Sequence, residues 1–301
     1  MQEEIINKIK VLKKRRNAVI LVHNYQKQEV QEIADFMGDS LELSRKAAST
    51  NADVIVFCGV HFMAETASIL SPDKKVLLPD LSSGCPMADM ITKEQLIKFK
   101  TENPGATVVT YINSTAEVKA ETDICCTSSN AINVVKSVEN DKIIFCPDRN
   151  LGSYVQKKLN KKLILWNGYC PTHMRMLPEY VIEQKKKHPN ALFLVHPECQ
   201  PATVELADEV LSTTGILNYV EKSDKDEFII GTENEITFML QRKYPNKKFY
   251  SVTDLAVCPN MKKNSLEKVL DVLQEMKNEI KVQEEIARKA IVPIQRMLEV
   301  K

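Results

Sequence analysis

The sequence predicts an α/β protein of three similar three-layer αβα domains, each with a small parallel sheet, related by pseudo-threefold symmetry. One observation is a Cys-Pro dipeptide at Cys85, Cys170 and Cys258, with nearly equal spacings of 85 and 88 residues. Another is that short apolar runs alternate with helical patterns, which is typical of parallel βαβ units. Other polar residues superpose when the chain is shifted by the same spacing, which predicts three copies of one unit. The superposed sets are His23/Tyr111/His196, Tyr25/Asn113/Glu198, Asp35/Asp123/Asp208, Ser40/Ser128/Thr213 and Asp53/Asp141/Asp226.

The first copy begins with an amphipathic helix, because its apolar residues recur at helical spacing. An apolar run without polar interruption then predicts a strand that is buried on both faces. Two further apolar runs predict the other strands of this copy, and helical patterns lie between them. In chain order we expect helix 3–16, strand 18–22, helix 28–37, a helix from 41 through 47, strand 53–58, helix 61–70 and strand 76–78.

The other two copies repeat this order. A helix over 92–102 leads to the second copy, with strands 108–110, 143–145 and 163–165 and helices 130–138 and 149–159. The third copy has strands 192–195, 228–230 and 249–251, and helices follow over 263–279 and 284–300. Pro293 predicts a kink in the last helix. The expected domains are 1–86 joined by the C-terminal helix 284–301, then 87–171, then 172–283; a single (β/α) barrel is the competing architecture.

Charge and hydropathy exclude several classes of function. The net charge is +1, from 41 basic and 40 acidic residues, so we expect no nucleic acid partner and no anionic membrane. No apolar run approaches the ~18 residues of a membrane span, and the N-terminal segment resembles an amphipathic helix rather than a signal peptide. We therefore expect a cytoplasmic protein with reduced thiols, in which eight cysteines indicate metal binding or catalysis more than disulfides.

Three of the superposed sets predict a ligand site, since ligands of parallel sheets bind beyond the carboxyl ends of the strands. The first strand of each copy ends in two polar residues spaced by two, which puts both on one side of an extended chain. The alternative is that they are ordinary strand-end residues bonded to loops. The hydroxyl-rich turns at Ser40, Ser128 and Thr213 each precede a helical segment. Each turn is either a simple N-cap of its helix, or the three turns together form a pocket that binds anionic groups.

The three Cys-Pro cysteines suggest a metal centre. Three soft thiolates on one axis suit an iron–sulfur cluster or zinc, and no Cys-x-x-Cys pair indicates an ordinary zinc ribbon or ferredoxin. Three ligands for a four-iron cluster leave one iron free to act as a Lewis acid. The alternative is three unrelated buried thiols, which is the interpretation we give to the remaining cysteines: Cys58, Cys125, Cys126, Cys146 and Cys199.

Six motifs along the chain resemble, in order and spacing, those of the quinolinate synthase family. The resemblance covers essentially the whole chain. The motifs are His23-Asn24-Tyr25-Gln26, Gly38-Asp39-Ser40, Gly59-Val60-His61-Phe62-Met63-Ala64-Glu65, Tyr111-Ile112-Asn113-Ser114-Thr115, His196-Pro197-Glu198-Cys199 and Met261-Lys262-Lys263-Asn264.

The resemblance implies a transferase of NAD biosynthesis that condenses iminoaspartate with dihydroxyacetone phosphate and releases phosphate and water, giving quinolinate. It implies a 4Fe-4S cluster with three cysteine ligands and one iron open to substrate or water, and an enzyme that supplies iminoaspartate. The metal ligands would be Cys85, Cys170 and Cys258. The catalytic residues would be Tyr25, Glu198, His196 and Tyr111, and the substrate would contact His23, Ser40, Asn113, Ser128, His173, His196, Glu198 and Thr213. Some members form a disulfide near the last ligand, but Pro259-Asn260-Met261 follows Cys258 here, so none is expected.

Three other interpretations remain open. The iron–sulfur protein that begins diphthamide synthesis also resembles three domains with one cysteine each, but it would need S-adenosylmethionine and a protein substrate. A redox or metal sensor would need neither Glu198 nor Tyr25. A plain binding protein with buried thiols would purify without colour under anaerobic conditions.

Overall fold

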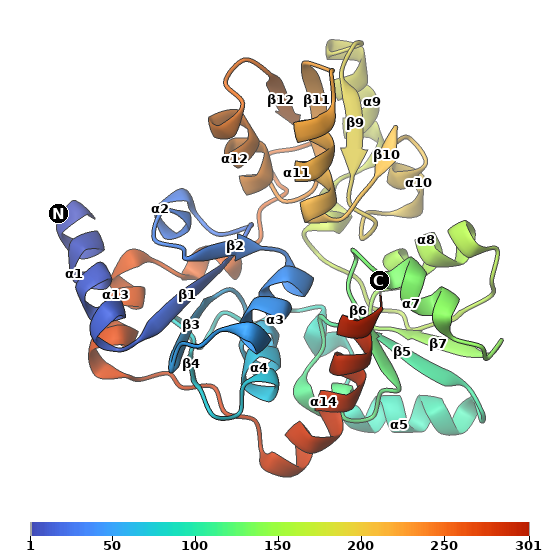
Figure 1. Ribbon diagram of the computed structural model, residues 1–301. Coiled ribbons are helices and arrows are strands. Elements are labelled where there is room, and N and C mark those ends of the chain that lie inside the picture. Colours follow the sequence, from blue (N-terminus) through green and yellow to red (C-terminus); the bar gives the residue numbers. More distant parts are fainter. Residues whose placement is uncertain (1, 301) are drawn as a thin grey trace.

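The computed structural model describes residues 2–300, and these residues form three lobes, each built on one four-stranded parallel sheet (Figure 1). The first sheet has the order β2 (Phe36–Gly38), β1 (Ala18–His23), β3 (Val54–Cys58), β4 (Lys75–Leu77). The second has β6 (Ile124–Cys126), β5 (Thr107–Tyr111), β7 (Ile143–Cys146), β8 (Ile164–Leu165). The third has β10 (Glu209–Val210), β9 (Leu192–Val195), β11 (Glu227–Gly231), β12 (Lys248–Ser251).

Helices connect the strands of each sheet and cover its faces, as parallel pairing requires. The α-helices are α1 (Gln2–Arg15), α2 (Gln28–Gln31), α3 (Ser40–Ser49), α4 (His61–Leu70), α5 (Lys93–Glu102), α6 (Ala116–Lys119), α7 (Ala131–Ser137), α8 (Arg149–Leu159), α9 (Pro178–Lys187), α10 (Pro201–Val204), α11 (Thr213–Lys222), α12 (Glu235–Lys243), α13 (Leu266–Glu275) and α14 (Glu284–Glu299). Short 3₁₀ helices follow the three Cys-Pro dipeptides: Ala88–Met90, His173–Arg175 and Met261–Lys263.

The predicted fold class is confirmed, and the three separate sheets rule out a single barrel. The prediction of three strands per copy was wrong, because each sheet has a fourth, short edge strand: β2, β6 or β10. The expected helix 28–37 ends at Gln31, and Phe36 pairs instead with Leu21 of β1. The helical spacing in this segment was real, but the ladder hydrogen bonds of the sheet outweighed local propensity.

A repeated aspartate fixes each edge strand to the central strand, which explains one superposed set as structural. In all three lobes its carboxylate accepts a hydrogen bond from a backbone N–H of the first strand, and its own N–H donates to the carbonyl of that same residue. The pairs are Asp35–Ile20, Asp123–Val108 and Asp208–Phe193, with carboxylate distances of 2.8, 2.7 and 2.7 Å.

The last two helices pack away from the lobe that precedes them. Helix α13 contacts α1, and α14 contacts β6, α6 and α4, so the C-terminal helix lies between the second and first lobes. Pro293 lies inside α14, which continues through it to Glu299. The domain division at residues 86, 171 and 283 stays a proposal, and the outer bounds at residues 1 and 301 lie outside the described residues.

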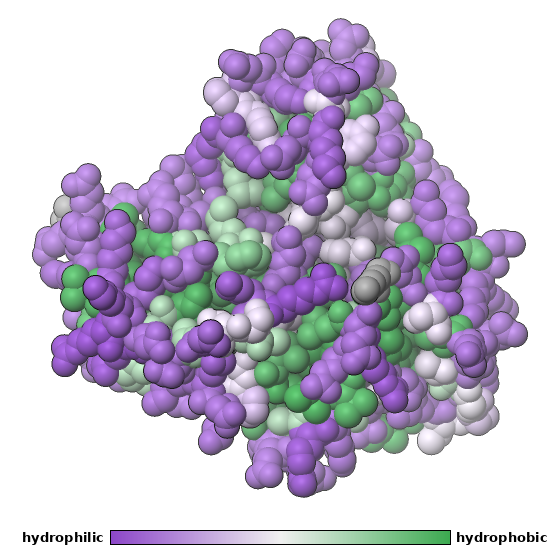
Figure 2. All heavy atoms as spheres, viewed as in Figure 1, coloured by the Kyte–Doolittle hydropathy of each residue, from purple (hydrophilic) through white to green (hydrophobic). Residues whose placement is uncertain are grey.

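Hydrophilic residues cover most of the outer face of the lobes in Figure 2, while paler and hydrophobic residues gather toward the centre, where the lobes meet. Burial of the strands accounts for the cores, since Ile20, Leu21 and Val22 of β1 are fully enclosed. A search of the described helices finds none with the length and apolar character needed to cross a bilayer.

Candidate active site

A cavity of about 220 Å³ lies where the three lobes meet. The carboxyl ends of the central strands β1, β5 and β9 reach it, as expected for parallel sheets. All predicted site residues line this one cavity: His23, Tyr25, Ser40, Cys85, Tyr111, Asn113, Ser128, Cys170, His173, His196, Glu198, Thr213 and Cys258. The structure thus brings together every residue predicted for the site, although their chemical roles stay predictions.

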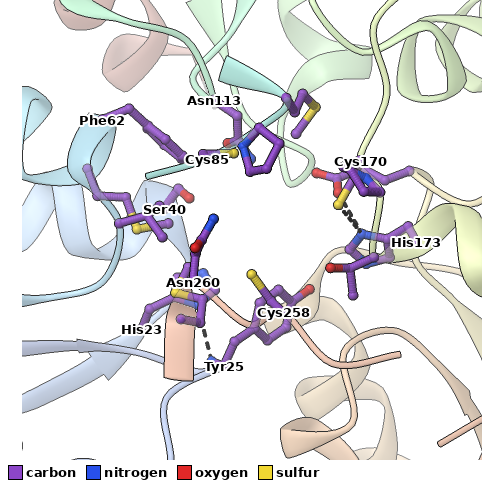
Figure 3. Close-up of a pocket in the computed structure, with 18 of the residues that line it drawn as sticks. His23, Tyr25, Ser40, Phe62, Cys85, Asn113, Cys170, His173, Cys258 and Asn260 are labelled. Carbon is purple, nitrogen blue, oxygen red and sulfur yellow. Dashed lines mark hydrogen bonds and ion pairs between the residues drawn. The ribbon is translucent and has the colours of Figure 1, made fainter. Parts of the chain in front are cut away.

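The three Cys-Pro cysteines point into the cavity from different sides (Figure 3). They are partly accessible, whereas the five other cysteines are buried; all eight are free thiols. This division agrees with the expectation that Cys58, Cys125, Cys126, Cys146 and Cys199 are structural, since each is fully enclosed in the core.

Each cavity cysteine begins the same local turn, in which the proline leads into a 3₁₀ helix whose N–H groups face the sulfur. Cys85 receives hydrogen bonds from the backbone of Met87 and Ala88. Cys258 receives them from two backbone groups of its own turn, and Cys170 from one. Backbone N–H donors of this kind favour a thiolate and are typical around cluster sulfurs.

Burial raises the pKa of the Cys85 thiol to about 12, and the neighbouring Cys258 adds to the rise. Burial also raises the pKa values of Cys170 and Cys258, and the pKa of Cys170 rises further because of the other two cavity cysteines. Three thiolates in one enclosed site repel each other. A bound metal cation removes this repulsion, because it stabilises the deprotonated form of each thiol that coordinates it. The donor set, the N–H groups and the shared cavity therefore fit an iron–sulfur cluster.

A second donor set overlaps the first. The Cys170 sulfur, a ring nitrogen of His173 and a carboxylate oxygen of Glu198 lie within 4.8 Å of one another. These residue types suit one divalent ion such as zinc. However, His173 Nδ1 already lies 2.7 Å from Glu198 Oε2 and 3.1 Å from Cys170 Sγ.

The histidines that end β1 and follow β9 are held in the same way. His23 Nδ1 accepts a hydrogen bond from the Tyr25 backbone at 3.1 Å, and His196 Nδ1 accepts one from the Glu198 backbone at 3.3 Å. Burial lowers the pKa of His23 to about 4 and that of His196 to about 3. Both rings are therefore neutral near pH 7 with the proton on Nε2, which is a hydrogen-bond donor; His196 Nε2 lies 3.1 Å from Ser128 Oγ.

Glu198 is a buried carboxylate at the centre of the polar contacts. Its Oε1 accepts a hydrogen bond from the Tyr111 hydroxyl, and its Oε2 contacts His173. Burial alone would raise the pKa of Glu198, but His173 and the hydrogen bonds from His173 and Tyr111 lower it to about 2. Glu198 is therefore ionised at neutral pH, and it raises the pKa of Tyr111 beyond the effect of burial.

Tyr25 ends a second chain of hydrogen bonds that reaches Glu198. The Tyr25 hydroxyl lies 2.7 Å from Thr232 Oγ1 and 3.0 Å from Thr213 Oγ1. Thr232 Oγ1 in turn lies 3.1 Å from His173 Nε2, whose other nitrogen contacts Glu198. The sequence does not predict Thr232 as a site residue, because it directly follows β11 but belongs to none of the superposed sets.

The hydroxyl-rich turns stand at helix N-termini, as predicted. Ser40 and Thr213 are the first residues of α3 and α11, and Ser128 precedes α7. All three residues line the cavity, and helix N-termini with hydroxyl side chains are an environment that binds anions. Asn113 adds a buried amide oxygen that has no hydrogen-bond partner among residues 2–300.

Comparison with known proteins shows the family of this chain. Residues 7–299 match the family described as Quinolinate synthetase A protein. A protein named quinolinate synthase from Geobacter sp. (strain M21) is 57% identical over 297 residues, or 99% of this chain and 98% of that protein. One from Dehalococcoides mccartyi (strain ATCC BAA-2266 / KCTC 15142 / 195) is 54% identical over 99% of both chains, and quinolinate synthase 2 of Methanosarcina acetivorans is 55% identical over 100% of this chain and 97% of its own. The chain therefore belongs to the quinolinate synthetase A family.

Proposed function

We propose that the protein is a quinolinate synthase of NAD biosynthesis, which condenses iminoaspartate with dihydroxyacetone phosphate to quinolinate and releases phosphate and water. The observation that carries this proposal is the shared cavity, where one cysteine from each lobe meets neutral histidines, an ionised Glu198 and three hydroxyl turns. We place the enzyme in the cytoplasm, supplied by an enzyme that makes iminoaspartate.

Cys85, Cys170 and Cys258 would hold a 4Fe-4S cluster, because they are the accessible thiols of the cavity and each receives backbone N–H donors. When bound, a cluster with three protein ligands supplies a Lewis acid at the remaining iron. The described cavity residues include no fourth cysteine.

The anionic groups of both substrates would bind at the helix N-termini. Ser40, Ser128 and Thr213 supply hydroxyl donors, and the protonated Nε2 atoms of His23 and His196 supply two more. Both histidines are neutral because burial lowers their pKa values, so they orient anions by hydrogen bonds rather than by charge. Asn113 offers its unpaired amide oxygen to an N–H or O–H of the substrate.

The proton transfers of enolisation and dehydration would be handled by Glu198 and Tyr25, supported by His196 and Tyr111. Glu198 is an ionised acceptor at the cavity wall. Burial and the Glu198 charge raise the pKa of Tyr25, so its hydroxyl keeps its proton and can donate it. Thr232 and His173 connect the two groups by hydrogen bonds, which lets a proton return between them.

The test is anaerobic purification with iron and sulfide counted, followed by a quinolinate assay with iminoaspartate and dihydroxyacetone phosphate. The wild type should contain both elements and form quinolinate, whereas Cys85→Ser should lose both. Sulfide distinguishes the two donor sets, because a single ion on Cys170, His173 and Glu198 carries none. Iron without sulfide, or a colourless active protein, would refute the proposed centre. A cluster spectrum that changes with S-adenosylmethionine would favour the diphthamide-type enzyme instead.

A further inference from the structure

The loop that presents Tyr25 is held by side chains at three consecutive backbone carbonyls. Gln31 donates to the carbonyls of Asn24 and Gln26, at 3.2 and 2.7 Å. Lys262 donates to the carbonyl of Tyr25 between them, at 2.6 Å. Gln31 belongs to the first lobe, but Lys262 lies in the 3₁₀ helix after Cys258. The backbone of Tyr25 is therefore fixed by a side chain from the metal-binding turn of another part of the chain.

A buried carboxylate holds Lys262 in place and also holds Cys258. Glu233 is fully enclosed. Its Oε1 accepts the Cys258 N–H at 3.1 Å and lies 3.1 Å from Lys262 Nζ. Its Oε2 accepts the Glu235 N–H at 2.9 Å and contacts Lys262 Nζ at 3.3 Å. A buried carboxylate needs such partners, so Glu233 ties the Cys258 backbone and the lysine ammonium to one rigid point.

A second contact between the same two segments runs alongside. Gln26 Nε2 lies 3.4 Å from Met261 Sδ, and Arg242 of α12 donates to Gln31 at 2.8 Å while it pairs with Glu235. Lys262 also lies 3.4 Å from Glu235. Among the contacts of the Tyr25 loop with the third part of the chain, Lys262 thus holds the Tyr25 backbone, whereas Thr213 and Thr232 contact only its hydroxyl.

We infer that Lys262 is a positioning residue, which fixes Tyr25 by linking its carbonyl through Glu233 to the turn of Cys258. We call these contacts the Lys262 link. The inference deepens the proposed function and rests on it for the role of Tyr25. It follows that the Tyr25 backbone and one proposed metal ligand share a common support, which fixes their relative position. Hydroxyl placement matters to turnover, because a shift of about 1 Å in a reacting group costs about 100-fold in rate.

Lys262→Met tests the link, since methionine keeps the apolar length of the side chain and removes the ammonium. Lys262→Arg is the conservative variant, which can still donate to Tyr25 and Glu233. Lys248→Met is the matched control, because it removes an ion pair with Glu227 (2.8 Å) from the third sheet, far in sequence from the Tyr25 loop. Three readouts are needed: iron content, kcat and KM, and amide hydrogen exchange of residues 24–27.

Lys262→Met should keep its iron and its KM, lose about 100-fold in kcat, and show faster exchange at residues 24–27. Lys262→Arg should recover most of the kcat, and Lys248→Met should match the wild type. Unchanged exchange and kcat in Lys262→Met would overturn the inference. Loss of iron together with activity would also overturn it, because Lys262 would then serve the Cys258 turn alone. The exchange comparison works equally in metal-free protein, so it decides the Lys262 link even if the wild type forms no quinolinate and the proposed function fails.

Discussion

Replacing Glu198 by glutamine changes one charge at the centre of the site while keeping the shape of the side chain. The carboxylate is 3% exposed and has two partners, the Tyr111 hydroxyl and His173. Its pKa is about 2 instead of 4.5. This difference means that the folded protein stabilises the ionised form over the protonated form by on the order of 3 kcal/mol more than the unfolded chain does. Because the folded pKa is depressed, this stabilisation is complete above about pH 4.5 and is lost as the pH falls toward 2.

Glu198→Gln removes that charge at every pH, so two losses are expected. Turnover should fall by about 100-fold to 10,000-fold, the range for a removed acid–base group. The unfolding free energy at pH 7 should fall by up to about 3 kcal/mol, since each hydrogen bond to a charged group contributes about 1.5–3 kcal/mol. The assays are quinolinate formation at measured iron and sulfide content, and urea unfolding of the metal-free protein.

Glu205→Gln is the matched control, because Glu205 is a carboxylate of the same lobe that forms an exposed pair with Lys157 at 2.9 Å. Exposed pairs of this kind contribute about 0–1 kcal/mol, so this variant should behave as the wild type. If Glu198→Gln kept full turnover with the cluster intact, the acid–base assignment would be wrong. If it lost iron, Glu198 would instead be part of the metal site with Cys170 and His173.

Three further predictions concern the metal ligands, the hydrogen-bond chain and the histidines. Cys85→Ser should lose iron and sulfide, whereas Cys146→Ser should keep both, since Cys146 is buried beside Thr110 (3.3 Å); equal metal content in the two would contradict the ligand assignment. Thr232→Val should lower kcat about tenfold, or about 1.4 kcal/mol, with KM unchanged, because the hydrogen bonds of Thr232 to Tyr25 and to His173 are both lost; a changed KM alone would indicate a binding role. In metal-free protein, His23 and His196 have pKa values of about 4 and about 3, below the ordinary histidine value of 6.5. As the pH falls below 6.5, these histidines take up protons in the unfolded chain but not in the folded one, so the folded state loses stability. Urea unfolding at pH 7 and pH 5 should show a loss of about 2 kcal/mol per histidine, and a variant with both replaced by glutamine should show a clearly smaller loss.

The sequence predicted the fold class and most members of the cavity because both follow from the repeat, whereas His173 was implied by the family resemblance alone. Residues such as His23, Tyr111 and His196 stand at equivalent strand ends, and equivalent strand ends meet at the axis. The edge strands were not predictable in the same way. Segments such as Glu209–Val210 are only two residues long, too short for any periodicity, and their pairing depends on an aspartate whose role becomes visible only in three dimensions.

Thr232 and Lys262 belong to no superposed set, since they break the repeat; the family resemblance includes Lys262 in the motif Met261-Lys262-Lys263-Asn264 but assigns it no role. Thr232 directly follows β11, where Gly59 and Pro147 follow the corresponding strands β3 and β7, so no superposed set includes it. Lys262 stands where Asp89 and Met174 stand in the other two Cys-Pro turns. Comparison of copies finds what is shared, and it passes over residues that belong to one copy alone.

The departures from symmetry suit the proposed reaction, which has no threefold symmetry. The three cysteine turns retain the symmetry, and this suffices to gather three sulfurs around one cavity. The strand-end sets do not retain it: the first copy supplies Tyr25, the second Asn113 and the third Glu198 at equivalent positions. A proton donor, an amide oxygen and a carboxylate therefore face the same space from different sides, and Thr232, from the third copy only, connects the first to the third. The shared residues thus determine where the site is, whereas the unshared residues determine which atoms it can protonate, and substitutions at the unshared positions should change turnover without releasing the metal.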